Sequence, residues 1–274
     1  MQQLVAIEKP SHWYLRNGDP LYEVPCKSKP GEMRPATLAD ARKVQAVPSV
    51  TTILSVIAKP ELEAWKITQA ILASLTLPRL QGEKEDAYAK RVAQDAASVS
   101  RDAADLGSAV HEYADLYDRT AAIVEDDGTK AIDPRVPGLV GGYAMWRRNH
   151  IRNWSDIELP FATQMYGGRI DRIGTALDGA PIIVDLKTQS TTQGHKVRAY
   201  ESYGLQLAAY AKGRNLGPEY KLWNVIISTT ELGRVEIVDW TERREELWRA
   251  FHHACELWCI LNKYDPRKAV SSGQ

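Results

Sequence analysis

The chain has 274 residues, of which 44% are hydrophobic and 26% are charged, and its 35 basic side chains balance its 35 acidic ones. This composition is typical of an ordinary soluble globular protein, and it excludes nucleic-acid binding through net charge alone. No apolar run is long enough to cross a bilayer, and no basic segment with an apolar stretch opens the chain. We therefore expect no membrane association and a cytoplasmic location.

The predicted elements follow one another from an irregular start to a helical end. Residues 1–47 carry turn-forming Pro and Gly groups and are expected to form an early hairpin over the core. Helical periodicity predicts helices at 61–75, 83–118, 134–150, 196–212 and 242–263. Apolar and β-branched runs predict strands at 157–165, 169–177, 181–187, 220–229 and 233–239. We expect a mainly helical N-terminal region, 1–150, packed on a core of residues 151–274 as one continuous unit.

The two middle strands are separated by Asp178-Gly179, which is a hairpin signal. Side chains alternate along a strand, so Asp185 and Lys187 share one face. A two-residue turn would place Asp171 opposite Leu186, whereas a three-residue loop with its glycine in the left-handed region places it opposite Asp185. We expect the second register, or a bulge with the same effect, because both carboxylates then reach one ion.

Two carboxylates beside one ammonium are the groups that Mg²⁺-assisted hydrolysis of a phosphodiester needs. The carboxylates of Asp171 and Asp185 hold the metal, and Lys187 steadies a water or a phosphate oxygen. An isolated Asp-x-Lys in a strand is more often a surface ion pair of little consequence. The motifs around it decide between these interpretations.

Five motifs in one order resemble the PD-(D/E)XK nuclease superfamily, specifically its RecB-like and phage-type exonuclease branch. In chain order they are Pro48-Ser49-Val50-Thr51-Thr52-Ile53-Leu54, Gly107-Ser108-Ala109-Val110-His111, Gly168-x-x-Asp171, Asp185-x-Lys187 and Gln206-x-x-x-Tyr210. The proline that usually precedes the first Asp is absent. The resemblance implies an α/β fold with a restriction-endonuclease-like core, in which helices flank a central mixed β-sheet, and a helical N-terminal region.

The resemblance also implies an activity, namely a DNA exonuclease that uses Mg²⁺ or Mn²⁺ on single strands or DNA ends in phage-type recombination, repair or replication processing. It implies that His111 and the backbone carbonyl of Leu186 join the two aspartates as metal ligands. Gln206 would contact Lys187 or the water and so act in catalysis. Glu158 resembles an acidic residue that precedes this hairpin in the family, and it is a candidate ligand of a second metal or of the water.

DNA contacts are expected from basic residues that cluster around the motifs in sequence and from the tyrosine of the last motif. These residues are Arg169, Lys196, Arg198 and Tyr210. Two simpler interpretations stay open. His111 could pair with Asp115, one helical turn away, and Tyr210 could pack in the core together with an uninvolved Gln206.

Three cysteines do not form a disulfide framework, and they are one short of a four-cysteine iron-sulfur cluster, so we expect no cluster. Two other classes of function remain. The chain could be a catalytically silent DNA-binding accessory protein with a nuclease-like fold, or an interaction module in which these residues form an incidental ion-pair network. The first binds DNA without cutting it, and the second binds neither DNA nor metal.

Overall fold

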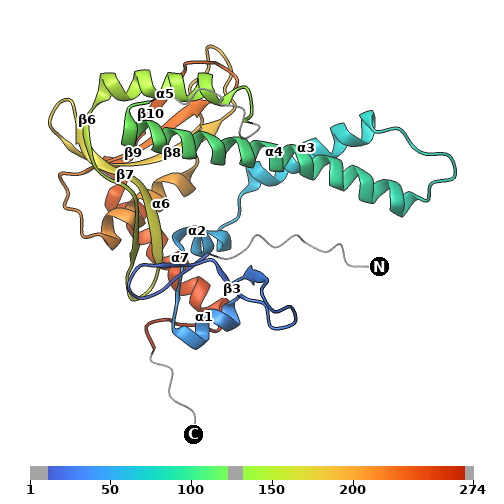
Figure 1. Ribbon diagram of the computed structural model, residues 1–274, viewed down its shortest axis with the longest axis horizontal. Coiled ribbons are helices and arrows are strands. Elements are labelled where there is room, and N and C mark those ends of the chain that lie inside the picture. The colour runs from blue at the N-terminus through green and yellow to red at the C-terminus, as the bar shows by residue number, and fades with distance from the viewer. Residues whose placement is uncertain (1–11, 123–131, 269–274) are drawn as a thin grey trace, which may run out of the picture.

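The computed structural model describes residues 12–122 and 132–268 (Figure 1). Its centre is a five-stranded sheet in the order β10-β9-β8-β7-β6. The strands are β6 (Ile151–Ala162), β7 (Gly167–Ala176), β8 (Pro181–Gln189), β9 (Lys221–Ser228) and β10 (Val235–Asp239). β8 and β9 run parallel, whereas the other neighbours are antiparallel. The expected mixed sheet is confirmed.

Helices cover both faces of this sheet (Figure 1). They are α4 (Glu85–Thr120) and α5 (Val136–His150) on one face, and α6 (Glu201–Gly213) and α7 (Arg244–Asn262) on the other. Side chains alternate between the two faces along β8, so this strand contributes to the apolar core on each side of the sheet. Val184 and Leu186 pack toward α4 and α5, while Ile183 packs toward α6 and α7. The α/β class with helices flanking the sheet is therefore confirmed.

The N-terminal segment forms small sheets beside the β6–β7 turn. Its elements are β1 (Trp13–Tyr14), β2 (Pro20–Leu21), β3 (Glu23–Pro25), β4 (Met33–Pro35), α1 (Leu38–Val44), β5 (Val47–Pro48), α2 (Val50–Ile53) and the 3₁₀ turn η1 (Leu54–Val56). β1 pairs with both β2 and β5, so the chain returns to its starting strand before α2. The expected early hairpin is present.

A helical arm projects from the core. It consists of α3 (Pro60–Thr76) and the first half of α4, which run side by side to the right of Figure 1. Their bounds lie within two residues of those predicted, because Pro60 opens α3 and an acidic first turn opens α4. Within the described ranges, no helix combines the length and the apolarity that a membrane span requires.

Two predicted starts differ most from the structure. β6 begins at Ile151 and not at 157, because α5 passes directly into it and the polar residues after Ile151 are held by pairing with β7 across two register shifts. α6 begins at Glu201 and not at 196, since the loop that follows β8 continues through Tyr200, which has an extended backbone. In both cases tertiary pairing outweighs the local pattern.

Candidate active site

The β7–β8 hairpin has the three-residue loop that was predicted from its sequence. The backbone N–H of Ala176 donates to the carbonyl of Ala180 at 2.9 Å, and Gly179 has a φ of +90°. An L-residue with a side chain would be strained there, so the glycine specifies this loop. The loop sets the register of the whole hairpin.

That register brings the two aspartates of the motifs to the same level of the sheet. The ladder pairs Arg172 with Val184 and ends there, so Asp171 and Asp185 are the next opposing residues. The ladder is not continued beyond this point. Instead, the Oδ2 atom of Asp171 accepts the backbone N–H of Leu186 at 2.7 Å. The two strands therefore part at the two carboxylates.

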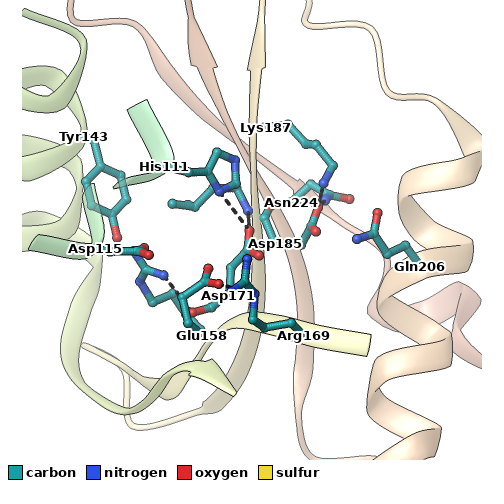
Figure 2. Close-up of polar contacts among 12 residues, drawn as sticks. His111, Asp115, Tyr143, Glu158, Arg169, Asp171, Asp185, Lys187, Gln206 and Asn224 are labelled. Carbon is teal, nitrogen blue, oxygen red and sulfur yellow. Dashed lines mark hydrogen bonds and ion pairs between the residues drawn. The ribbon is translucent and has the colours of Figure 1, made fainter. Parts of the chain in front are cut away.

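Asp185 is buried and points toward α6 (Figure 2). Its Oδ2 atom lies 2.6 Å from the Nζ atom of Lys187 and accepts the side-chain N–H of Asn224 at 2.7 Å. Its Oδ1 atom is also buried and has no hydrogen-bond partner in the described part of the chain. Burial raises the pKa of Asp185 to about 7, although Lys187 favours the ionised carboxylate. Burial favours a neutral Lys187, but Asp185 and Asp171 keep its pKa above the usual value.

Asn224 was not predicted as a site residue. It is aligned with Asp185 across the parallel β8–β9 pair, and its Oδ1 atom accepts the indole N–H of Trp240 at 2.7 Å. Asn224 therefore holds Asp185 with one end of its amide and is itself held at the other. The available signal was a single amide in the otherwise apolar run of β9, which indicates a buried hydrogen-bonding role.

Gln206 and Tyr210 form a buried pair on α6. The side-chain N–H of Gln206 donates to the Tyr210 hydroxyl at 2.8 Å, and Gln206 projects toward Asp185 (Figure 2). The Tyr210 ring packs on β7, where a Cβ added to Gly168 would lie 2.7 Å from it, so the glycine of this motif makes room for the ring. Tyr210 is only 4% exposed. It supports Gln206 from the core, and its contact with DNA stays a prediction.

A second, more open group lies on the α4 side of Asp171. His111, Glu158 and Asp171 each offer one ligand atom, and these atoms all lie within 4.8 Å of one another (Figure 2). All three residues are partly exposed. The structure groups Glu158, and not Asp185, with His111 and Asp171. The separation is 3.6 Å between the Nδ1 atom of His111 and the Oδ2 atom of Asp171.

The electrostatics of this open group favour a neutral imidazole beside carboxyl groups. Burial lowers the pKa of His111, although Asp171 opposes this effect. Burial, reinforced by Asp171 and Asp115, raises the pKa of Glu158 to about 7. A neutral imidazole and carboxylate oxygens are groups that a divalent cation can bind.

Two backbone features bring these side chains together. A Cβ added to Gly107 would lie 2.9 Å from the hydroxyl of Thr188, so the glycine lets α4 approach β8 closely one turn before His111. Glu158 lies opposite Asp171 in the β6–β7 pair and has a φ of +55°. This left-handed conformation is uncommon for a non-glycine residue inside a strand, and such strain concentrates at functional sites.

Beneath the open group, a buried arginine ties α4 to β7. The guanidinium of Arg172 donates to Asp118 at 2.7 Å and to Asp115 at 2.5 Å. Asp118 also accepts the hydroxyl of Tyr143 at 2.6 Å. The alternative pairing of His111 with Asp115 is not what the structure shows, because Asp115 binds Arg172 and His111 lies beside Asp171. This network was not predicted, since it joins residues that are distant in sequence.

The three basic residues expected to contact DNA lie in different surroundings. The Nε atom of Arg169 lies 2.6 Å from the Oε2 atom of Glu158, at the site. Lys196 is exposed on the loop before α6, and the guanidinium of Arg198 donates to Glu61 on α3 at 3.0 Å. Of these three, Arg169 is the one that is tied directly to the open group.

The two cysteines of α7, Cys255 and Cys259, are free and buried, and burial raises the pKa of both thiols. They pack as small apolar groups among Phe251 and Trp258. Cys26 is also a free thiol, in the N-terminal segment.

Comparison with known proteins gives one family match. Residues 86–217, just under half of the chain, match the sequence model of the PD-(D/E)XK nuclease superfamily. The matched segment includes both groups of the site except Asn224. The match and the mixed sheet flanked by helices are consistent with a restriction-endonuclease-like fold, and the match suggests metal-dependent nuclease activity.

Other comparisons add little. No curated protein matches the chain. Among solved structures, this chain is similar to the crystal structure of SSO0001, with 15% sequence identity and a TM-score of 0.23. The similarity covers 42% of this chain and 56% of that one, so the chain spans little more than half of that protein's length.

Proposed function

We propose that the protein is a metal-dependent deoxyribonuclease that hydrolyses phosphodiester bonds of DNA. The observation that carries this proposal is the junction at β7 and β8. There Asp171 connects a buried Asp185–Lys187 pair to an open group of histidine and carboxylates. A structural ion-pair network would not require a buried carboxylate oxygen without a partner in the described chain, as Asp185 has.

The donor atoms of the site fit a divalent cation. His111, Glu158 and Asp171 would hold it, and the unpartnered Oδ1 atom of Asp185 and the backbone carbonyl of Leu186 are further oxygen donors. A ligand set made mostly of oxygen atoms suits Mg²⁺, while the imidazole nitrogen favours Mn²⁺. The bound cation would polarise the scissile phosphate and lower the pKa of a water molecule.

The buried pair would supply the cationic group of the reaction. Lys187 is held by Asp185 at one side, and its side chain remains 22% exposed. Its ammonium can therefore donate to the attacking water or to a phosphate oxygen as negative charge develops. Gln206, held by Tyr210, would orient the same water from α6.

We further propose that the enzyme is an exonuclease of the RecB-like or phage-type branch, which works in the cytoplasm on single strands or DNA ends during recombination, repair or replication. The order of the motifs supports this, together with the helical segment 48–118, which would wall a channel for one strand. Such a channel admits a terminus far more readily than an internal segment.

The decisive assay uses labelled single- and double-stranded DNA with Mg²⁺, Mn²⁺ or EDTA. We expect cleavage with either metal and none in EDTA. Binding without cleavage would favour the silent accessory protein, and neither binding nor cleavage would favour the interaction module. For the exonuclease, linear single-stranded DNA should be degraded much faster than closed circles of the same sequence. Comparable rates on both would contradict the exonuclease assignment and leave the metal chemistry intact.

A further inference from the structure

The N-terminal hairpin is fixed to the strand that carries Asp171. Ser49, next to β5, forms a parallel bridge with Gly167 at the start of β7. The guanidinium of Arg16 donates to the carbonyl of Gln164 in the β6–β7 turn at 2.8 Å. These contacts involve backbone groups on the β6–β7 side. The hairpin of β1 and β2 is therefore held in place beside the site and forms a wall there. It lies outside the segment that matches the superfamily.

This wall presents aromatic rings next to Arg169. The hydroxyls of Tyr14 and Tyr22 lie 3.0 Å apart, and the ring of His12 lies 4.9 Å from that of Tyr22 at 43°. Tyr14 is buried, whereas Tyr22 is partly exposed and His12 is exposed. The hairpin packs directly onto β7 beside Arg169, since a Cβ added to Gly167, two residues earlier, would lie 2.7 Å from the Cβ atom of Tyr14. The exposed rings and the guanidinium thus form one surface.

Arg169 connects this surface to the open group. Its side chain is 50% exposed and is paired with Glu158, which lies beside His111 and Asp171 (Figure 2). A half-exposed guanidinium can donate to a phosphate while it keeps a carboxylate partner, since it carries five N–H donors. A phosphate bound by Arg169 would lie at the edge of the site.

We propose that His12, Tyr22 and Arg169 form a subsite for a nucleotide of single-stranded DNA, next to the phosphate that is cut. Arg169 binds the phosphate of that nucleotide, and its base stacks on the rings of His12 and Tyr22. Stacking on exposed rings needs a base whose face is free, which a single strand provides and a duplex covers. The subsite rests on the proposed nuclease function and extends it to a substrate contact.

A purely structural role is the competing explanation, in which the two rings only stabilise the hairpin. The two explanations differ in their dependence on the base. A stacking subsite loses its contribution when the base is removed from the DNA. A structural defect weakens the binding of any nucleic-acid backbone, with or without bases.

The test measures fluorescence anisotropy of labelled single-stranded oligothymidylate, and of an abasic oligomer of equal length, in EDTA to prevent hydrolysis. The full-length variants are His12→Ala, Tyr22→Ala and Tyr22→Phe. His252→Ala is the matched control, because His252 is also exposed and rests on an aromatic ring, at 5.6 Å from that of Trp248 on α7.

We expect both alanine variants at the subsite to bind oligothymidylate about five-fold or more weakly, which corresponds to the loss of one base stack. Their affinity for the abasic oligomer should stay unchanged. Tyr22→Phe should keep the wild-type affinity because it keeps the ring, and His252→Ala should behave as wild type. Arg169→Gln should weaken the binding of both oligomers and make it less sensitive to salt.

Unchanged oligothymidylate binding by the alanine variants would overturn the subsite and leave the nuclease proposal standing. Equal losses for both oligomers would also overturn it, since the effect would then be structural. A wild-type protein that binds neither oligomer and cuts no DNA would overturn the subsite and the proposed function together.

Discussion

The two halves of the candidate site are built in opposite ways. In the buried half, Asp185, Lys187 and Asn224 lie on adjacent parallel strands. In the open half, His111, Glu158 and Asp171 come from a helix and two antiparallel strands and are partly exposed. The carboxylate of the buried half is fixed by an ammonium and an amide, whereas the groups of the open half can be reached from solvent.

This difference suggests a division of labour. Buried polar groups with fixed partners keep one geometry, because any rearrangement leaves a group unsatisfied. Partly exposed groups can exchange a protein partner for a ligand at lower cost. We therefore assign positioning of the reacting groups to the buried half and binding of metal and substrate to the open half. The hydrogen bond from Leu186 to Asp171 joins the two.

The largest expected effect is on stability, at the arginine that supports the open half. Arg172→Met leaves Asp115 without its arginine and the buried Asp118 with Arg147 as its remaining cation, so the free energy of unfolding should fall by about 3–5 kcal/mol. Urea denaturation measures this loss. Arg135→Ala is the control, because Arg135 pairs with Asp133 at the surface and should contribute less than about 1 kcal/mol. Similar losses in the two variants would mean that the network does not support the fold.

The next effect is on catalysis, in the buried half. Lys187→Ala should lower the single-turnover cleavage rate by about 10²–10³-fold while DNA affinity changes little, since the ammonium acts mainly in the transition state. Lys221→Ala is the control, because Lys221 also pairs with an aspartate, Asp178, but at the far end of the hairpin. Cleavage by Lys187→Ala at the rate of Lys221→Ala would remove the lysine from the mechanism.

A smaller effect concerns pH and the open half. Burial and Asp171 raise the pKa of Glu158 from 4.5 to about 7, so the folded protein retains a proton that the unfolded chain releases. The stability due to this proton is complete below pH 4.5 and is lost as the pH rises through 7. In EDTA, Glu158→Gln should therefore gain about 1–3 kcal/mol relative to wild type across this interval.

Urea denaturation at a series of pH values measures this gain. Glu63→Gln provides a control, since Glu63 is an exposed carboxylate paired with Lys66 and should show no such trend. A stability difference between Glu158→Gln and wild type that does not change with pH would show that the pKa of Glu158 is not raised in the folded protein.

Features of the site that depend on local chemistry could be predicted from the sequence. The Asp178-Gly179 signal and the alternation of strand residues left two registers for this hairpin, and the expectation that both carboxylates reach one ion chose the register that the structure has. The mixed sheet and the helical elements followed from periodicity and from the resemblance. The relative placement of the two aspartates within this hairpin was therefore predictable from residue type and spacing together with the expected metal chemistry.

Partners that are distant in sequence were not accessible in this way. Asn224 meets Asp185 only through a parallel strand pair, and Arg172 meets Asp115 only because α4 packs over the sheet. The burial of Tyr210 likewise depends on the space left by Gly168. Such pairings are decided by tertiary packing, on which residue type and spacing carry little information.

The central claim is that the open half binds a divalent cation, and titration with Mn²⁺ followed by thermal unfolding tests it most directly. At a concentration of about 100 times its Kd, the cation should stabilise the wild type by about 2.7 kcal/mol and raise its Tm by several degrees. His111→Ala and Asp171→Asn should lose most of this shift, Asp185→Ala should also reduce it, and His252→Ala should keep all of it. Equal shifts in the wild type and in the His111 and Asp171 variants would contradict the assignment of the metal to this site.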